Sequence, residues 1–273
     1  MLLMFLLELD EVTKTFPAKI GGWRGRKDLY LALDRVSLGI GERECVALVG
    51  ESGSGKSTLG HLILGLERPD SGAVRFMGQD WHRMTSRERQ PFRKYMNAVF
   101  QNSSAALNPR MKAGDIVLEP LYNYEKMGKQ AYKECAGELL ARVGLDPSSA
   151  DLYPHQFSGG EQQRLAIARA IAVRPKLIVL DEATSSLDAI TQFEILALLK
   201  ELQRNLNMSY LFITHDMKAA CTFADRLVVM EEGRIVDESS IDFVKNLSHP
   251  AALKLLDSML ITHPSQRERV LDL

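Results

Sequence analysis

A glycine-rich segment early in the chain has the residue types and spacing of a phosphate-binding loop. It comprises Gly50, Glu51, Ser52, Gly53, Ser54, Gly55, Lys56, Ser57 and Thr58. Glycines let successive backbone N–H groups turn inward onto phosphate oxygens, and a helix predicted to start near Leu59 adds its positive dipole end. We expect Lys56 to reach the β- and γ-phosphates and the Ser57 hydroxyl to bind Mg²⁺. The segment therefore predicts binding of a nucleoside triphosphate with magnesium. Its position between a predicted strand and a predicted helix is the context in which this motif occurs.

Two adjacent carboxylates, Asp181 and Glu182, directly follow the apolar run Leu177–Leu180. Carboxylates at the C-terminal end of a buried strand stand where ligands bind in open α/β sheets. We expect Asp181 to hold Mg²⁺ through a water molecule and Glu182 to polarise the attacking water. Together with the glycine-rich loop, these acids predict hydrolysis of the bound nucleotide.

A second phosphate cradle is predicted at Ser158–Gly160, at the start of a helix. That helix has an apolar stripe formed by Leu165, Ala168 and Ala172. One chain cannot direct two cradles at one γ-phosphate if they lie on different subdomains. The sequence therefore favours a dimer in which each nucleotide contacts both chains.

Short apolar runs and helical patterns alternate along the chain, which indicates an α/β fold. A helix is expected after the N-cap Asp188, because apolar residues recur there at helical spacing. The middle, about residues 103–156, is expected to be a mostly helical insert with segments near 116–124 and 131–143. The apolar start, residues 1–7, is interpreted as the first strand. The runs predicted to be buried strands of a parallel sheet are 45–49, 177–180, 210–213 and 227–230.

Composition excludes several classes of protein. The chain has 273 residues, 34 basic and 35 acidic side chains and a formal net charge of −1, so no global basic field attracts nucleic acid or anionic lipid. Its three cysteines are scattered, which argues against a disulfide framework and fits a reducing compartment. No stretch approaches the roughly 20 apolar residues that a transmembrane helix needs. If the protein works at a membrane, another chain must supply the span.

The ordered motifs resemble those of the ATPase subunits of ABC transporters along nearly the whole chain. In that family's terms, residues 50–58 are the Walker A motif, residues 158–162 the signature, residues 177–181 the Walker B motif and residues 186–188 the D-loop. The fold that the resemblance implies is a P-loop NTPase domain with a RecA-like core, an antiparallel β subdomain and a helical insert. Its expected limits are residues 1–240, followed by a C-terminal extension over residues 241–273.

The same resemblance implies roles for further side chains. Phe16 matches the aromatic residue that stacks on adenine, and His215 matches the histidine that contacts the γ-phosphate. Gln101 would sense Mg²⁺ and the attacking water, and it would couple them to the insert that docks on the membrane partner. The signature residues expected to contact ATP are Ser158, Gly159, Gly160 and Gln162.

Family organisation also implies partners and a location. We expect a head-to-tail dimer with a second ATPase subunit, either a copy of this chain or a paralogue. Two transmembrane permeases and, indirectly, an extracytoplasmic solute-binding protein would complete the system, which places the chain at the cytoplasmic face of the cell membrane. Two departures from the family pattern are Ala183 in place of proline and Asn102 in place of aspartate. Neither removes a phosphate or metal ligand.

Several features narrow the subfamily to importers of peptides, opines and nickel. The segment Ser104–Arg110, the long stretch between Phe16 and Leu31, and His249-Pro250 are similar to those ATPases. Within the group, residues 181–183 and 212–216 and the overall length look most like nickel-import ATPases. No histidine cluster forms a nickel site, and the cargo is not contacted by this subunit, so peptide and opine import stay open.

Other classes with the same motifs fit less well. A DNA-repair ATPase needs a long coiled coil between Lys56 and Ser158, and the roughly one hundred residues between them are too few once local structure is placed. A translation factor of this type has two tandem cassettes, whereas this chain has one. An exporter ATPase is harder to exclude than these two classes, although it usually lacks the Leu107–Arg110 segment and the C-terminal His-Pro extension.

Overall fold

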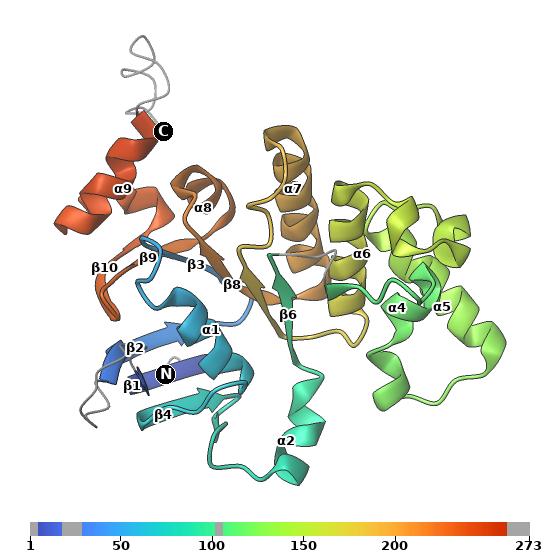
Figure 1. The fold of residues 1–273 in the computed structure, drawn as a ribbon, viewed down its shortest axis with the longest axis horizontal. Helices are drawn as coiled ribbons and strands as arrows, with labels where there is room; N and C mark the ends of the chain where they lie inside the picture. The colour runs from blue at the N-terminus through green and yellow to red at the C-terminus, as the bar shows by residue number, and fades with distance from the viewer. Residues whose placement is uncertain (1–4, 18–28, 102–105, 261–273) are drawn as a thin grey trace, which may run out of the picture. The chain divides into compact units, whose positions relative to one another are not determined.

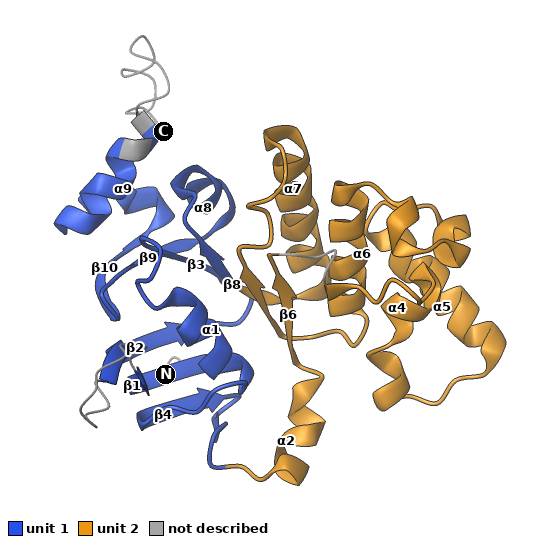
Figure 2. Cartoon of the chain, viewed as in Figure 1, with its two compact units in different colours: residues 1–83, 212–273 blue, residues 84–211 orange. Residues whose placement is uncertain are grey.

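The computed structural model describes residues 5–17, 29–101 and 106–260, and these residues form two compact units (Figure 2). Unit 1 comprises residues 1–83 and 212–273, and unit 2 comprises residues 84–211. Several sequence features lie outside the described residues: residues 1–4, most of the stretch between Phe16 and Leu31, Asn102, Ser104 and residues 261–273.

Unit 1 contains an antiparallel sheet with the strand order β2-β1-β4-β5. Its strands are β1 (Leu7–Pro17), β2 (Leu29–Ile40), β4 (Ser71–Phe76) and β5 (Gln79–Asp80). The register of β1 against β2 shifts between Leu9 and Val12, where Glu11 has a φ of 46°. The first strand begins at Leu7, so the expectation that the apolar start itself forms this strand is wrong for Phe5 and Leu6.

The second part of unit 1 is a sheet segment covered by helices (Figure 1). Strand β3 (Cys45–Val49) is buried along its whole length and pairs in parallel with β9 (Arg226–Glu231), while β10 (Arg234–Ser240) pairs antiparallel with β9. Burial of β3 on both faces explains why its sequence is a continuous apolar run without alternation. The accompanying helices are α1 (Lys56–Leu64), α8 (Met217–Phe223), the 3₁₀ segment η4 (Ile241–Asn246) and α9 (Pro250–Leu260).

Unit 2 combines two parallel strands with most of the helices. Strands β6 (Met96–Phe100) and β7 (Leu177–Asp181) pair so that Phe100 stands opposite Asp181. The helices are α2 (Ser86–Arg93), α4 (Ala113–Leu118), η1 (Leu121–Asn123), α5 (Lys129–Arg142), η2 (Pro147–Asp151), η3 (Pro154–Gln156), α6 (Gly159–Ile171) and α7 (Ala189–Leu206). Strand β8 (Ser209–Thr214) carries the chain from unit 2 back into unit 1.

The structure confirms all four predicted buried strands, as β3, β7, β8 and β9. Asp188 caps α7 as expected, through its carboxylate to the N–H groups of Ile190 and Thr191. The helical segment predicted near 116–124 is divided, because α4 ends at Leu118 and a separate 3₁₀ turn follows after Pro120. Pro120 lacks the N–H that would continue the α-helical bonding pattern.

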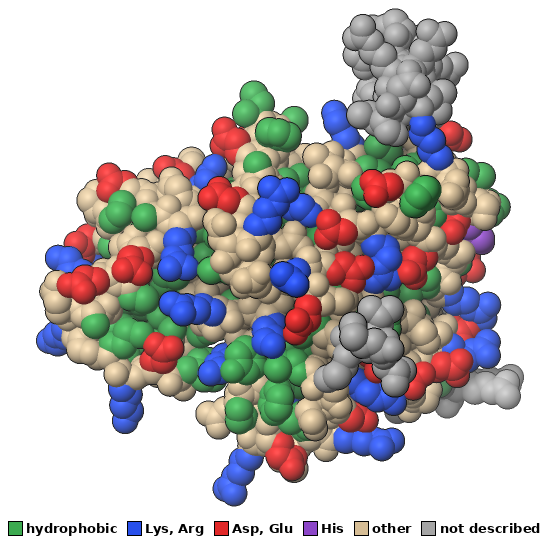
Figure 3. Space-filling model, turned by 180° about the vertical axis from the view of Figure 1, so that it is seen from behind, with side chains coloured by type: hydrophobic (Ala, Val, Ile, Leu, Met, Phe, Trp, Pro, Cys, Tyr) green, Lys and Arg blue, Asp and Glu red, His purple; other side chains and the backbone are tan. Residues whose placement is uncertain are grey.

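Surface charge matches the near-neutral composition. Lys and Arg side chains are interspersed with Asp and Glu side chains over the face drawn in Figure 3. Among the described residues, no helix combines the length and apolar character needed to cross a bilayer. No disulfide joins the three cysteines, all of which lie among the described residues.

Candidate nucleotide site

The glycine-rich loop of unit 1 connects the buried strand β3 to α1, and two of its glycines have no room for a side chain. A Cβ atom on Gly50 would lie 2.1 Å from the carbonyl oxygen of Met230. Gly55 has a φ of 103°, and a Cβ atom there would lie 2.5 Å from the carbonyl oxygen of Ala32. Both positions therefore require glycine, since backbone atoms cannot yield as a flexible side chain does.

Lys56 lies at the centre of this loop. Its side chain donates hydrogen bonds to the carbonyl oxygens of Gly50 and Glu51, each at 2.7 Å, and to the Ser54 hydroxyl at 3.2 Å. The residue is only 6% exposed. A buried ammonium surrounded by loop carbonyls has a fixed position, and it is available to phosphate oxygens with little loss of side-chain freedom.

Helix α1 begins at Lys56, inside the motif, rather than near Leu59 as the sequence predicted. Its N-cap is Gly55, which makes no side-chain capping bond. The N–H groups of the first turn, those of Lys56, Ser57 and Thr58, therefore belong to the loop itself, because the α-helical bonding pattern starts only after them. Such groups, with the helix dipole, favour a bound anion.

Phe16 lies on β1 directly opposite Tyr30 of β2, and Tyr30 connects this pair to the phosphate loop. The Tyr30 hydroxyl donates a hydrogen bond of 3.1 Å to the carbonyl oxygen of Gly53. The Lys14 ammonium stands 5.1 Å from the centroid of the Phe16 ring, within the range of a cation–π contact. Unit 1 thus places the predicted adenine-stacking ring on the strand next to a residue that touches the loop.

A pocket of about 880 Å³ adjoins the first half of the phosphate loop. Its walls are Gly50–Ser54, the start of β2, the β9–β10 hairpin and one face of α9. Two ion pairs lie along it, between Asp34 and Arg234 and between Glu51 and Lys254. The C-terminal extension is therefore part of the wall of this pocket.

His215 follows strand β8 in unit 1 and is exposed. The next residue, Asp216, caps α8 by accepting a hydrogen bond of 3.1 Å from the N–H of Ala219. The Asp216 N–H in turn donates to the Thr214 hydroxyl at 3.0 Å. This compact turn fixes the backbone on both sides of His215 and leaves the imidazole at the C-terminal end of the strand.

The predicted acids and Gln101 come together in unit 2. Gln101 is the residue after Phe100, whose partner in the neighbouring strand is Asp181, so Gln101 and Glu182 both leave the same edge of the β6–β7 pair. Glu182 has a φ of 48°, a left-handed conformation that costs a non-glycine residue about 1–2 kcal/mol. The carbonyl of Glu182 accepts bonds from the Ser185 N–H and hydroxyl, at 3.1 and 3.0 Å, which hold this turn.

These residues suit magnesium by donor type. The Ser57 hydroxyl, the Gln101 amide oxygen and the Asp181 carboxylate are hard oxygen ligands of the kind that Mg²⁺ selects. No group of three or more His, Cys, Asp or Glu side chains among the described residues is arranged to hold a metal ion by itself.

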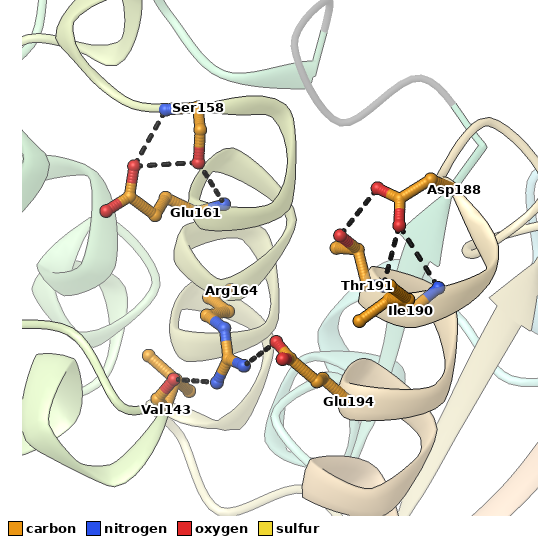
Figure 4. Close-up of polar contacts among 8 residues, drawn as sticks. All are labelled: Val143, Ser158, Glu161, Arg164, Asp188, Ile190, Thr191 and Glu194. Carbon is orange, nitrogen blue, oxygen red and sulfur yellow. Dashed lines mark hydrogen bonds and ion pairs between the residues drawn. The ribbon is translucent and has the colours of Figure 1, made fainter.

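A capping box fixes the signature segment at the start of α6 (Figure 4). The Ser158 hydroxyl accepts a bond of 3.3 Å from the N–H of Glu161, and the Glu161 carboxylate accepts bonds of 2.8 Å from both the N–H and the hydroxyl of Ser158. These bonds from Ser158 hold the pKa of Glu161 below its usual value. The pattern Ser-x-x-Glu is readable in sequence, so this role of Glu161 is one that the sequence prediction missed.

The remaining signature residues differ in what they contact. Gln162 donates to the carbonyl oxygens of Pro154 and Phe157, at 2.9 and 3.1 Å, so its amide nitrogen binds the preceding loop. A Cβ atom on Gly159 would point into open space. A Cβ atom on Gly160 would lie 2.7 Å from the Thr191 methyl group, which brings the signature against the start of α7.

Arg164 connects α6 to two neighbouring parts of unit 2 (Figure 4). It donates a bond of 2.8 Å to the carbonyl oxygen of Val143, which follows α5, and lies 3.3 Å from the carboxylate of Glu194 on α7. One guanidinium therefore joins the signature helix to the helical segment before it and to the helix after it. At the start of α7, Asp188 accepts bonds from the Ile190 N–H and from the Thr191 N–H and hydroxyl.

The predicted site residues divide between the two units. Unit 1 holds Phe16, residues 50–58 and His215, and it brings the first two together through Tyr30. Unit 2 holds Gln101, residues 158–162, Asp181 and Glu182. Tyr30, Glu161 and Lys254 contribute contacts that the sequence did not predict, and only Glu161 has a local sequence signal.

A family model described as "ABC transporter" matches residues 33–185. The nickel import ATP-binding protein NikE of Rhodospirillum rubrum is 42% identical over 241 residues, which cover 88% of this chain and 87% of that protein. The oligopeptide transport ATP-binding protein OppF of Lactococcus lactis is also 42% identical, over 235 residues that cover 86% of this chain and 74% of that protein.

Solved structures with the same fold include the ATP-binding cassette MJ0796, a dimer bound to ADP and phosphate in a post-hydrolysis state. It is 32% identical, with a TM-score of 0.75 over 86% of this chain and 98% of the other. The cbiO1 protein of Clostridium perfringens has a TM-score of 0.77 at 24% identity, covering 98% of this chain and 99% of that one. The second likeness shows the fold alone.

Proposed function

Because this chain belongs to the ABC transporter family, as an ATP-binding and ATP-hydrolysing subunit of the importer type, we propose that it powers the import of nickel through partner permeases. The observation that carries the choice of cargo is the match to NikE. That match spans 87% of the relative, whereas the equally identical match to OppF spans 74% of its relative. The match to NikE thus covers most of the length of both proteins.

The proposal assigns nucleotide binding to unit 1. Lys56 and the N–H groups at the start of α1 hold the β- and γ-phosphates, Ser57 contributes an oxygen to Mg²⁺, and Phe16 stacks on adenine. The support is local geometry: Lys56 is already fixed among loop carbonyls, and Phe16 stands opposite the tyrosine that touches Gly53. Bound Mg²⁺ supplies charge neutralisation at the phosphates.

Hydrolysis depends on unit 2 in this proposal. Glu182 accepts the proton of the attacking water, and Gln101, which follows the neighbouring strand, orients that attacking water. Asp181 would hold Mg²⁺ through a different water molecule. His215 of unit 1 contacts the γ-phosphate. The support is the strand register, which puts Gln101 and Glu182 at one edge of the sheet.

The signature of one chain is proposed to close the nucleotide site of a second ATPase subunit, either a copy or a paralogue. The dimeric state of MJ0796 supports an assembly of this type. Ser158, Gly159 and Gly160 offer the N-terminal end of α6 to the γ-phosphate, while Gln162 positions the loop. We place the ATPase domain in residues 1–240, the helical insert in about 103–156 and the extension in 241–273. The complex would dock on permeases at the cytoplasmic face of the membrane.

Peptide import is the second candidate, because OppF has the same percentage identity as NikE. Deletion of the gene, followed by uptake of labelled nickel and of a labelled dipeptide, separates the two. We expect nickel uptake to fall to the background level while dipeptide uptake is unchanged. Loss of dipeptide uptake alone would assign the chain to a peptide importer.

Complementation supplies the control for this experiment. The wild-type gene should restore uptake, whereas a gene encoding Lys56→Ala should not, although both chains accumulate. Restoration by Lys56→Ala would contradict the assignment of ATP binding to this loop, whatever the cargo.

A further inference from the structure

The C-terminal helix α9 approaches the phosphate loop at one charged contact. The Lys254 ammonium lies 2.5 Å from the carboxylate of Glu51, the second residue of that loop. Ala251 and Leu255, on the same helix, line the pocket that the loop also lines. Two parts of the chain separated by two hundred residues thus meet beside the backbone that is proposed to hold phosphate.

Contacts other than Lys254 hold α9 in place. The Asp237 carboxylate accepts bonds of 2.7 and 2.8 Å from the N–H groups of Ser248 and His249, just before the helix begins. Ala252 of α9 is fully buried. The side chains of Lys254 and Glu51 are 75% and 66% exposed, and exposed ion pairs of this kind add little to stability. The pair is therefore not needed to fasten the helix.

The negative charge of Glu51 lies within the phosphate loop, and the contact with Lys254 compensates it. A carboxylate within a phosphate loop repels a bound triphosphate, because like charges interact unfavourably even in water. The hydrogen bond and charge of Lys254 hold the pKa of Glu51 below its usual value, so the carboxylate is ionised at neutral pH. The partner that compensates this charge comes from the C-terminal extension.

We propose that Lys254 is a positioning residue for nucleotide binding, which neutralises Glu51 and so reduces the repulsion between the phosphate loop and ATP. The inference rests on the proposed role of the loop in binding ATP. It gives the C-terminal extension a function at the nucleotide site, one that the resemblance to other ATPases does not assign.

The test measures the affinity of the full chain for MgATP and MgADP in four forms: wild type, Lys254→Met, Glu51→Gln and the double variant. Lys254→Met should weaken MgATP binding by about threefold at ~0.01 M salt and by about 1.5-fold at ~0.15 M, because salt screens the uncovered charge. MgADP, with one phosphate fewer, should be affected less. Glu51→Gln should bind MgATP at least as tightly as the wild type.

The double variant distinguishes charge from structure. If Lys254 acts by neutralising Glu51, removing both charges returns the affinity to that of the wild type. If Lys254 instead held α9 mechanically, the double variant would stay as weak as Lys254→Met, since the ion pair is absent from both. That result, or an unchanged affinity of Lys254→Met at low salt, would overturn the proposal.

Two controls complete the design. Arg83→Met removes one positive charge from another ion pair of unit 1, in which the exposed Arg83 lies 3.2 Å from the half-buried Asp80, and should not change the affinity. Lys56→Ala tests the loop itself: if it binds MgATP as well as the wild type, the proposed nucleotide site is wrong. If Lys56→Ala loses affinity for MgATP as expected but Lys254→Met does not, only the role of Lys254 is rejected.

Discussion

The two segments proposed to bind phosphate are built in different ways. In unit 1, the phosphate loop is fixed by packing: Gly50 and Gly55 face backbone carbonyls with no room for a Cβ atom, and Lys56 is 6% exposed. In unit 2, the signature is fixed by exposed polar bonds between Ser158 and Glu161. The first arrangement resists change because backbone atoms cannot move aside, whereas the second depends on a solvent-accessible carboxylate.

The two segments should therefore differ in how easily their conformations change. A loop held by buried contacts keeps its shape whether or not a ligand is present, which suits tight binding of phosphate. A helix start held by side-chain caps is worth about 1 kcal/mol, so small changes in charge or composition alter it. Substitutions in the two units should therefore differ in kind as well as in size.

The largest effect is expected from a substitution in unit 2 that stops ATP hydrolysis without changing ATP binding. Glu182→Gln should lower kcat by about 10³-fold, within the range found when a general base is removed, while MgATP affinity is retained. The variant should also accumulate as an ATP-bound dimer, detectable by size-exclusion chromatography. Glu11→Gln is a matched control, because Glu11 has nearly the same backbone conformation, with a φ of 46°, and should keep normal turnover. Normal turnover in Glu182→Gln would remove this residue from the mechanism.

The next effect lies in unit 1. Lys56→Ala should weaken MgATP binding by about 100-fold, equivalent to roughly 3 kcal/mol, because charge-assisted bonds to phosphate are lost. Isothermal titration measures the change, and circular dichroism checks that the variant is folded. An affinity within about threefold of the wild type would show that the loop does not bind through this ammonium.

A smaller effect tests the signature cap. Ser158→Ala should lower the free energy of unfolding by about 1 kcal/mol, the usual cost of losing an N-cap, as measured by urea denaturation. Thr85→Ala removes the corresponding cap of α2, which has the same reciprocal arrangement with Glu88. Both variants should lose similar stability, but only Ser158→Ala should also reduce turnover. Equal turnover in the two would confine Ser158 to a structural role.

The smallest effect is a dependence on pH. The bonds from Ser158 lower the pKa of Glu161 below its ordinary value of 4.5, so their contribution to stability is fully present above that value. The contribution is lost as the pH falls through the lowered pKa of the folded state. Between neutral and acidic pH, stability should therefore fall more steeply in the wild type than in Glu161→Gln. If the free energy of unfolding, measured by urea denaturation, depends on pH in the same way in both proteins, the cap makes no measurable contribution to the pH dependence of stability.

Sequence predicted the parts of the fold that have strong local patterns. The apolar runs became β3, β7, β8 and β9 because strands buried on both faces need continuous apolar residues. Asp188 was predictable as an N-cap because its effect is confined to the next three residues. The start of α1 was placed too late, since glycine and polar residues conceal a helix that begins within the phosphate loop.

Contacts between distant segments were not predictable in this way. Tyr30 reaches Gly53 because β2 and the loop meet in space, and Lys254 reaches Glu51 across most of the chain length. The side chain of Gln162 binds Pro154 and Phe157, although its position in the signature predicts a ligand contact. Such pairings depend on tertiary packing, for which a single sequence carries no periodic signal.

The β9–β10 hairpin is hydrogen-bonded on one side to the phosphate loop and on the other to the antiparallel sheet, through the backbone of Gly233. The N–H of Gly233 donates to the carbonyl oxygen of Ser54 at 3.0 Å, and the N–H of Asp34 donates to the carbonyl oxygen of Gly233 at 2.8 Å. Each amide proton can exchange with deuterium only when its bond opens. The exchange rates of Gly233 and Asp34 therefore record how often the loop and the sheet separate, at two positions that no nucleotide needs to touch.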